Sequence, residues 1–528
     1  MNSMIDLFKR LEQLNEIGAA LSSERDIGRL LEKILLAAKA ITHADGGTLY
    51  RMTEDGSALR FEIVCNDTLG IAPGSAAGFP DLPLHMPEGI PNKALVAVCA
   101  VLEDRTIDIA DAYSEAGFDF SGTREFDART GYRSQSFLTV PMKNHEGTII
   151  GVLQLINSKH PETGEVRKFP QAAQHLAESL ASQAAIALTN RQLITQLEEL
   201  FESFIGLINL AIDEKSPYTG GHCQRVPALT MMIAEAVNAT KEGPLAGFAM
   251  SEAELYELKI AGLLHDCGKV TTPVHVVDKA TKLQTIFDRI GLIDTRYEVL
   301  KRDVQIATLR KLLELRAKSD PAAEAACWED CRSELEVMDE EREFLHRCNA
   351  GCEAMSPEDR QRVREIGTQR TWRNPAGVDT DFLTADEIEN LTIRSGTLTA
   401  GEREVINHHI VATIRMLEAL PWPKHLKHVP EYAGGHHERM DGKGYPKGLT
   451  REQMSLQARM MGIADIFEAL TARDRPYKQG MKLSQALEIM RKFAVSGHID
   501  PDLFRVFIDQ MVFRRYAEAF LDPAQTDI

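Results

Sequence analysis

The sequence lacks three features that would place the protein in a membrane or on nucleic acid. It contains no apolar run of about 18 residues, which excludes a transmembrane helix. Its N-terminus is charged and periodic, unlike a signal peptide, so we expect a cytoplasmic protein. It also lacks an excess of positive charge. The formal net charge of −18 argues against nonspecific binding to nucleic acid or to an anionic membrane.

Cysteine is sparse as well, with eight residues in a chain of 528. Cys65, Cys99, Cys223 and Cys267 are scattered, which is typical of reduced thiols in a cytosolic protein. The rest of the composition, 44% hydrophobic and 26% charged, is that of a globular protein. A chain of this length is too long for one core, so we expect two or three domains.

The first third of the chain predicts an α+β module. A helix over residues 1–26 precedes a second helix that Asp26 caps. Segments rich in β-branched and aromatic residues follow, namely GGTLYRMT, LRFEIVCN and SFLTVPMKNHEGTIIGVLQLINSK. A long helix begins at about Gln171. This order of helix, antiparallel strands and exit helix predicts a sensor domain.

The segment over residues 27–190 resembles a GAF domain. The resemblance depends on the pattern TGYRSQSFLTVPM…GVLQLINSK between Thr130 and Lys159. GAF domains that bind cyclic nucleotides carry an Asn-Lys…Phe…Asp-Glu signature. Asn157, Lys159 and Phe169 match this signature loosely, and the Asp-Glu pair is missing. Two alternatives therefore stay open: a sensor for an unknown ligand, and a structural dimerisation module.

The exit helix continues through residues 191–212 with an apolar stripe. Leu193, Leu197, Leu200, Phe204 and Leu207 alternate spacings of four and three, the period of a two-stranded coiled coil. The alternative is a single helix that packs on its own domain. Because this helix joins two modules, we favour a homodimer through the GAF domain and the connecting helix.

Five fragments in the remaining chain carry residues that bind metals. They are GGHCQRV around His222, LLHDCGK around His265 and Asp266, INHHIV around His409, GGHHERMDGKGYP around His436 and His437, and GIADIFEALTARDRPYK around Asp465. Each fragment lies in or beside a predicted helix, and imidazole and carboxylate ligands together suit iron, manganese or zinc. On one helix His265 and Asp266 are about 100° apart, so both can address one site.

These fragments, in this order, resemble the HD-GYP family of metal-dependent phosphodiesterases. The resemblance covers residues 200–520 apart from an insertion, and it implies an all-α HD-type domain over residues 213–521. Members of the family cleave cyclic di-GMP and sometimes related cyclic dinucleotides. The resemblance implies two divalent metals, for which iron or manganese is expected. It assigns one metal to His222, His265, Asp266 and Asp465, and the second to His409, His436 and His437, with Asp266 bridging both.

Phosphodiester hydrolysis requires neutralisation of charge on the phosphorus oxygens, and this chemistry indicates residues that contact the substrate. For each basic residue among them, the alternative is a solvated surface charge. Lys269, three residues after Asp266, is placed to hold a nonbridging phosphate oxygen or to protonate a leaving group, so we count Asp266 and Lys269 as catalytic. Arg475 and Lys478 suit the second phosphate of a cyclic dinucleotide. Tyr445 is expected to stack on the substrate or to pack at the edge of the site.

Two positions bear on the details of this assignment. His408, beside His409, is the alternative ligand, which we disfavour because of the spacing to Val411 and Leu417. Some family members bind a third metal through a Glu four residues before the first histidine. Tyr218 occupies that position here, so we expect two metals and linear pGpG as the product, with GMP as the alternative.

A long insertion over residues 280–398 separates the two halves of the expected site. Its sequence predicts an antiparallel helical hairpin with Cys327 and Cys331 on one helix and Cys348 and Cys352 on the other. Each pair is spaced i, i+4, so its sulfurs share one helix face. The four thiols suit a separate zinc site or two reducible disulfides. The alternative is four small buried residues in the core of the hairpin.

Two further functions compete with cyclic di-GMP hydrolysis. One is the hydrolysis of a hybrid cyclic dinucleotide or of another nucleotide phosphate. The other is a catalytically silent effector that binds the dinucleotide or a partner. The presence of all seven expected metal ligands argues against the silent effector.

Overall fold

The computed structural model describes residues 24, 26–75, 79–87, 89–215, 221–317, 320–351, 354–473 and 480–528. The chain divides into two compact units, residues 1–200 and 201–528. Most of the predicted first helix (residues 1–26), Tyr218, Cys352, Arg475 and Lys478 lie outside the described residues. None of the described helices combines the length and the apolar composition that crossing a bilayer requires.

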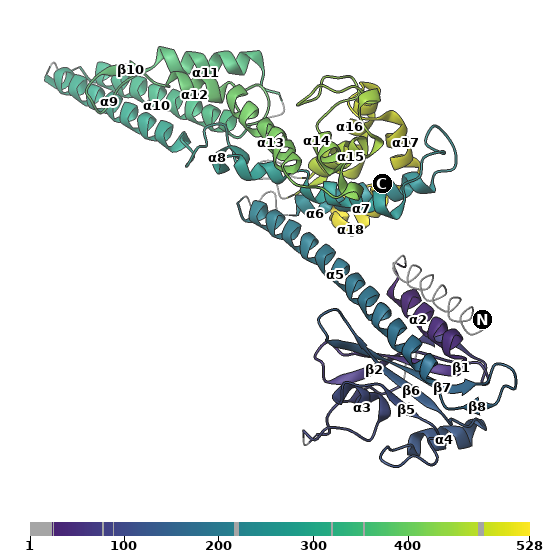
Figure 1. Cartoon of the computed structure of the whole chain (residues 1–528). Coiled ribbons are helices and arrows are strands. Elements are labelled where there is room, and N and C mark those ends of the chain that lie inside the picture. The colour runs from purple at the N-terminus through teal and green to yellow at the C-terminus, as the bar shows by residue number, and fades with distance from the viewer. Residues whose placement is uncertain are drawn as a thin grey trace. The chain divides into compact units, whose positions relative to one another are not determined.

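The first unit is an antiparallel sheet with helices on both faces (Figure 1). The strand order is β3-β2-β1-β7-β6-β5, with β4 paired to β2 and β8 to β7. This arrangement confirms the predicted α+β fold of the first third of the chain. The elements are α2 (Ile27–Thr42), β1 (Ala44–Met52), β2 (Ala58–Asn66), β3 (Ile71–Ser75), β4 (Leu82–Pro83), α3 (Val96–Leu102), β5 (Ile107–Ile109), α4 (Ser121–Thr130), β6 (Phe137–Lys143), β7 (Ile149–Lys159), β8 (Val166–Arg167) and α5 (Gln171–Lys215).

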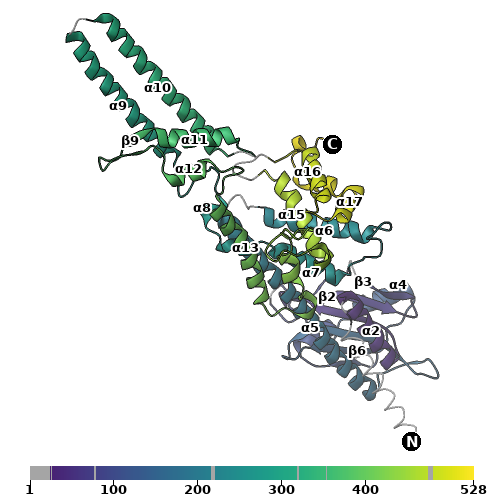
Figure 2. The same cartoon turned by 90° about the horizontal axis from the view of Figure 1, so that it is seen from above.

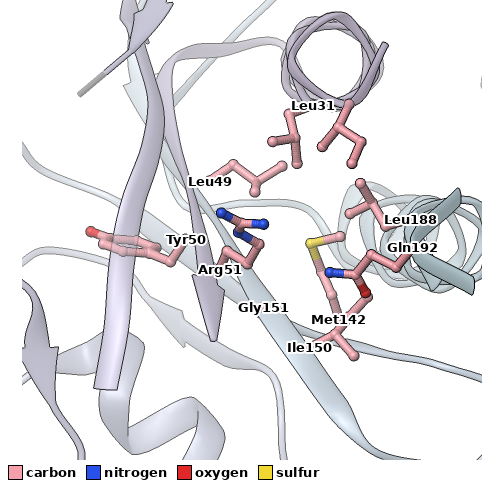
Figure 3. Close-up of a pocket in the computed structure, with 10 residues that line it drawn as sticks. Leu31, Leu49, Tyr50, Arg51, Met142, Ile150, Gly151, Leu188 and Gln192 are labelled. Atoms are coloured by element: carbon pink, nitrogen blue, oxygen red, sulfur yellow. The ribbon is translucent and has the colours of Figure 1, made fainter. Parts of the chain in front are cut away.

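Helices α2 and α5 bury their apolar faces on one side of this sheet. Asp26 caps α2 as predicted, because its carboxylate accepts a hydrogen bond from Arg29 N at 2.7 Å. Figure 3 shows Leu31 from α2, Leu188 from α5 and Met142 from β6 around a cavity of about 20 Å³. A space of that size holds no more than a water molecule. The two helices are therefore closely packed on the sheet.

Helix α5 begins at Gln171, as predicted, and extends beyond residue 200 into the second unit. Its predicted coiled-coil stripe is exposed along its length. Leu193, Leu197, Leu200, Phe204 and Leu207 have exposed fractions between 46% and 65%. Single exposed apolar residues are common, but five at heptad spacing form a continuous unpartnered seam on this helix.

The second unit is almost entirely helical, in agreement with the predicted all-α domain. One large core joins helices from both ends of this unit. The elements are α6 (His222–Ala239), α7 (Glu252–Leu264), η1 (Cys267–Thr271), α8 (Val274–Val277), α9 (Ile290–Ala317), α10 (Pro321–Asn349), α11 (Pro357–Gln369), β9 (Thr371–Arg373), β10 (Asp379–Asp381), α12 (Ala385–Leu391), α13 (Ala400–Glu418), η2 (Lys424–Leu426), α14 (Val429–Gly434), η3 (Arg451–Gln453), α15 (Leu456–Thr471), α16 (Leu483–Val495), α17 (Pro501–Asp509), α18 (Val512–Phe520) and η4 (Pro523–Gln525).

The insertion forms the predicted hairpin, in which α9 and α10 lie side by side (Figure 2). It has a core of its own, built on residues such as Ile293, Tyr297, Met338 and Phe382. A separate core allows the insertion to fold without taking apolar residues from the surrounding domain.

The predicted four-cysteine site is wrong for the thiols that the structure describes. Cys327, Cys331 and Cys348 all lie on α10, not on two facing helices. Cys348 follows Cys331 by 17 residues, which is roughly 25 Å at 1.5 Å per helical residue. Those three sulfurs cannot share one ion. Cys327 and Cys331 are instead buried as small apolar residues between the helices.

Two buried lysines fix the base of the insertion, Lys279 to the start of α13 and Lys282 to the returning end of the insertion. The Lys279 ammonium donates to both carboxylate oxygens of Glu402, at 2.7 and 2.8 Å, and to Asn390 Oδ1 at 2.8 Å. The Lys282 ammonium donates to the carbonyls of Leu391 and Ile393. Glu402 also completes the capping box that starts α13. The clamp between Lys279 and Glu402 therefore fixes the start of α13 to the base of the insertion.

We predict that Lys279→Met destabilises the second unit by about 2–3 kcal/mol, because it leaves the Glu402 carboxylate without its buried partner. Urea unfolding followed by circular dichroism measures this change. The matched control is Lys259→Met, which removes a half-exposed pair with Glu202 and should change stability by less than about 0.5 kcal/mol. Equal effects of the two variants would contradict the role of the clamp.

Candidate metal centre

The structure brings all seven predicted metal ligands into one buried cluster. His222 is the first residue of α6, His265 directly follows α7, and Asp266 directly precedes η1. His409 lies on α13, His436 and His437 follow α14, and Asp465 lies on α15. The alternative ligand His408 is exposed, whereas His409 is 4% exposed and lies in the cluster.

Two groups within this cluster have the geometry to hold a metal ion, and Asp266 belongs to both. One group consists of His222, His265 and Asp266, and the other of Asp266, His409, His436 and His437. Asp266 Oδ2 lies 3.0 Å from His222 Nε2, and Asp266 Oδ1 lies 3.2 Å from His409 Nε2. The two oxygens of one carboxylate thus face two different sets of imidazoles.

Asp465 lies between these groups and belongs to neither of them. Its Oδ1 is 3.4 Å from His222 Nε2, and its Oδ2 is 3.9 Å from His437 Nδ1. This position is compatible with the first metal, to which the sequence assigned it, and also brings the carboxylate close to the second group.

Three of the histidines are oriented by the same backbone contact. The Nδ1 atoms of His265, His409 and His436 lie 2.5–2.7 Å from the carbonyl oxygen three residues earlier, in Gly262, Ile406 and Ala433. A carbonyl only accepts, so each Nδ1 carries the proton and each Nε2 presents a lone pair. A ring nitrogen fixed in this way is typical of metal-binding histidines.

Two buried polar atoms in the cluster have no hydrogen-bond partner among the described residues. They are Asp266 Oδ1 and His436 Nε2. Buried polar atoms are normally satisfied, and each exception calls for an explanation. A divalent cation bound by both atoms satisfies them, and the HD fold reported below implies such a cation. The chemistry of the donor set therefore fits a metal.

The charges of the cluster are balanced by neighbouring groups. Burial alone would raise the pKa of Asp266, but the Lys269 ammonium and His265 hold it well below its usual range. Burial and Lys269 lower the pKa of His222, yet Glu468 and Asp266 outweigh them and raise it to about 9. Burial lowers the pKa of His437 to about 4 and that of His436 well below its usual range. A metal at His222 must therefore displace a proton, whereas His436 and His437 are already neutral.

Glu468 is a residue of the site that the sequence did not indicate. Its Oε2 lies 2.6 Å from His222 Nδ1, and its Oε1 accepts hydrogen bonds from Arg225. Burial raises the pKa of this carboxyl, but His222 and Arg225 lower it to about 2. The carboxylate orients His222, as backbone carbonyls orient the other histidines. The available signal was an acid three residues after Asp465 on the same, mostly apolar helix.

Gly268 brings the two halves of the cluster into direct contact. Its N–H donates to Thr413 Oγ1 at 2.9 Å, and a Cβ at this position would lie 2.0 Å from the carbonyl oxygen of His409. Only glycine permits this approach of η1 to α13. The turn after Asp266 therefore packs directly on the helix that carries His409.

The loop with Gly444, Tyr445 and Pro446 supports the cluster from one side. The buried carboxylate of Glu438 accepts hydrogen bonds from the backbone N–H groups of Lys447 and Leu449, at 2.7 and 2.8 Å. The Tyr445 ring stacks on His437, with 4.9 Å between the ring centroids. Tyr445 thus packs against a predicted ligand at the edge of the site, which was one of the two expected roles.

Lys269 lies inside the cluster, where its ammonium is hydrogen-bonded to Asp266 Oδ2. Burial lowers the pKa of Lys269, but the adjacent Asp266 carboxylate raises it overall, so the ammonium stays charged. Arg475 and Lys478, the two other predicted contacts of the substrate, lie outside the described residues.

The GAF-like unit has a separate cavity of about 250 Å³ on the face of its sheet that carries no part of α5. Tyr50, Phe61, Tyr132, Phe137 and Gln154 are among the residues that line it, and no charged side chain does so within the described part of the chain. The loosely matched cyclic-nucleotide residues are used elsewhere. Asn157 accepts backbone hydrogen bonds, Lys159 pairs with Asp45, and Phe169 packs in the core under α5.

Comparison with known families identifies two domain types in the chain. Residues 26–188 match the GAF domain, and residues 219–345 and 384–503 match HD domains. The chain therefore carries a GAF domain followed by an HD domain, in agreement with the two domain types expected from the sequence. The gap between the two HD matches falls within the insertion.

Curated relatives match shorter parts of the chain. A cyclic di-GMP phosphodiesterase of Pseudomonas aeruginosa is 40% identical over 115 residues, which cover 22% of this chain and 27% of the relative. The 3'3'-cGAMP-specific phosphodiesterase 1 of Vibrio cholerae is 45% identical over 80 residues, or 15% of this chain and 18% of the relative. The chain thus spans about a quarter or less of the length of these relatives. Among solved structures, the GAF domain of a phosphoenolpyruvate-protein phosphotransferase from Coxiella burnetii is 14% identical, with a TM-score of 0.28, and covers 35% of this chain and 96% of its own.

We predict that Glu468→Gln weakens binding of one metal ion by about 10–100-fold, because the neutral amide no longer fixes the orientation of His222. Titration calorimetry with Mn²⁺ measures this affinity. Glu257→Gln is the matched control, since Glu257 is also a buried carboxylate that contacts a histidine ring, His428, outside the cluster. An affinity for Mn²⁺ that is the same in both variants and in the wild type would show that Glu468 does not position a ligand.

Proposed function

We propose that the protein is a metal-dependent phosphodiesterase that hydrolyses cyclic di-GMP to linear pGpG. It would consist of a GAF sensor over residues 27–190, a connecting helix over 191–212 and an HD-GYP domain over 213–521, with the insertion at about 280–398. The names of the relatives from Pseudomonas aeruginosa and Vibrio cholerae support a cyclic dinucleotide as the substrate class.

The observation that carries this proposal is the position of Asp266 between two groups of imidazoles. In the proposed site His222, His265, Asp266 and Asp465 hold one divalent metal, and Asp266, His409, His436 and His437 hold the second. Iron or manganese is the proposed pair, because imidazole and carboxylate donors together suit these ions. Paired divalent metals supply a hydroxide at neutral pH and neutralise charge on a phosphodiester.

The chain's own residues would hold and orient the substrate around this pair. Lys269 carries a buried ammonium beside Asp266, which would neutralise a nonbridging oxygen of the phosphodiester or give a proton to the leaving oxygen. Tyr445, stacked on His437, would limit one side of the site. Arg475 and Lys478 are proposed to hold the second phosphate of the dinucleotide.

A hybrid cyclic dinucleotide is the second candidate substrate. The relative from Vibrio cholerae that matches at 45% identity is named for 3'3'-cGAMP. Both candidates share the same phosphodiester chemistry and differ only in one base. The cluster of metal ligands therefore does not discriminate between them, and residues that contact the bases must do so.

We predict that the wild-type protein loaded with Fe²⁺ or Mn²⁺ converts cyclic di-GMP to pGpG, and that Asp266→Asn lowers the rate at least about a thousandfold, because both metals lose a shared ligand. Chromatography of the products from cyclic di-GMP, 3'3'-cGAMP and a nucleoside monophosphate measures substrate preference. Asp509→Asn, an exposed acid on α17, is the control. Hydrolysis that is unchanged in Asp266→Asn would refute the metal mechanism, and preference for 3'3'-cGAMP would refute only the choice of substrate.

We further propose that the GAF domain regulates this activity through α5. The last residue of α5, Lys215, donates to the carbonyl oxygens of Lys269 and Val270 in η1. A shift of α5 would thus act directly on the turn that carries Lys269. The uncharged, aromatic cavity near Tyr50 and Phe137 is the proposed place for a ligand of the GAF domain.

The exposed stripe of α5 supports a homodimer in which two copies of this helix pair. We predict that Leu197→Glu with Leu200→Glu makes the protein monomeric, because each dimer would bury four carboxylates in an apolar seam. Sedimentation equilibrium measures the mass. Thr195→Glu, on the opposite side of the helix, should leave the dimer intact. A wild-type protein that is monomeric at micromolar concentration would contradict the proposal.

A further inference from the structure

The outer half of the inserted hairpin has no core of its own. The core of the insertion includes residues of α9 up to Val304 and residues of α10 from Met338 onward. Beyond these positions, only Thr308, Leu312, Cys327 and Cys331 are buried among the described residues of the two helices. Two helices that share so few contacts gain little stability from packing.

The ion pairs of the hairpin define which residues lie opposite each other. Lys301 pairs with Asp339, and Arg316 pairs with Glu324. In both pairs the two residue numbers sum to 640, so residues of α9 and α10 whose numbers have this sum lie opposite each other along the hairpin. Leu312 is therefore opposite Trp328. The exposed Leu309 and Leu313 of α9 are therefore near the same level as Trp328 of α10.

These exposed apolar residues lie on one face of the hairpin. Leu309, Leu313 and Trp328 each directly follow a buried residue, Thr308, Leu312 or Cys327. Arg332, which follows the buried Cys331, adds one exposed charge to the same face. Each residue of an α-helix is rotated by about 100° about the helix axis from the residue before it. Because α9 and α10 are antiparallel, a two-fold axis perpendicular to the plane of the hairpin relates them. Residues that directly follow a buried residue therefore lie on the same side of that plane in both helices. Ile306 extends this face, because it lies three residues before Leu309. The exposed fractions of Ile306, Leu309, Leu313 and Trp328 are between 47% and 69%. We call these four residues the outer apolar face.

The opposite face of the same hairpin is small and polar. The residues that directly precede the buried ones are Ala307, Lys311, Ala326 and Asp330. The two faces of the hairpin therefore differ in polarity. The polar face is suited to contact with solvent, and the outer apolar face is suited to burial against other helices.

The charges of the two helices indicate what covers the outer apolar face. Between residues 302 and 317, α9 carries four Lys or Arg residues and two acids. Between residues 321 and 337, α10 carries five acids and one Arg. A second copy of the hairpin would place its acidic α10 beside the basic α9 of the first, and the reverse contact would follow by symmetry.

We propose that the outer apolar face binds the same face of a second copy, so that two hairpins form a four-helix bundle with α9 of each chain beside α10 of the other. Ile306, Leu309 and Leu313 follow the spacing of three and four that helix bundles use at their seams. Pairing of the two faces supplies the outer half of the hairpin with the core that it lacks. This interaction is independent of the phosphodiesterase activity and of the α5 stripe.

Site-specific photo-crosslinking of the full-length protein tests this interaction. Leu313→p-benzoylphenylalanine places a photoreactive ring on the outer apolar face, and Lys311→p-benzoylphenylalanine places it on the polar face. A mixture of ¹⁴N- and ¹⁵N-labelled chains is irradiated, and mass spectrometry identifies the linked peptides. We expect position 313 to link to the α10 peptide that contains Trp328 in a chain of the other isotope, and position 311 to give no such product.

A further Leu309→Glu substitution should reduce the yield of the linked dimer at least about tenfold, because it buries a carboxylate in the seam. The proposal is overturned if position 313 gives no link between chains, links to the first unit of its own chain or to another protein, or links no more than position 311 does. A link from α9 to α9 of the second chain overturns the proposed arrangement in which the basic α9 of one chain lies beside the acidic α10 of the other. None of these outcomes depends on the α5 dimer, because the photoreactive side chain links only to residues that are in contact with position 313 or 311.

Discussion

The carboxylate of Asp266 is the group on which the arrangement of the second unit depends. Its two oxygens face imidazoles from helices far apart in the sequence, α6 and α13, and its side chain also holds the Lys269 ammonium. A buried carboxylate in contact with this many groups is stable only if the elements around it are fixed. The contact of Gly268 with α13, the carboxylate of Glu468 on His222 and the loop held by Glu438 all serve this purpose.

The sequence predicted the chemistry of the site better than its supports. The seven ligand positions are recognisable because histidine and aspartate occur in short fragments beside predicted helices, and the structure brings them together. Glu468 was missed because one acid in an apolar helix has no partner that the sequence can reveal. Lys279 was missed because a lysine in a loop is normally solvated, whereas here it is 1% exposed. The prediction of a four-cysteine site was wrong because the i, i+4 spacing shows only that the two cysteines of a pair share one helix face. It does not show whether two such pairs lie on different helices.

The insertion interrupts the site in the sequence but not in space. It enters after η1 and returns just before α13, so it separates Asp266 from His409 by more than a hundred residues of chain. The clamp of Lys279 on Glu402 and the bonds of Lys282 hold the entry and the exit together. With its ends fixed and a core of its own, the hairpin extends the domain without moving α13 away from Asp266. An added interaction surface can therefore be placed next to the site at little cost to the site.

A crystal structure of the protein purified without air, with anomalous scattering measured at the iron and manganese edges, tests the central claim most directly. The account predicts two anomalous peaks about 3.5–4 Å apart, with the Asp266 carboxylate between them. His222 and His265 should contact one peak, and His409, His436 and His437 the other. A single peak, or two peaks that do not share Asp266, would contradict the account.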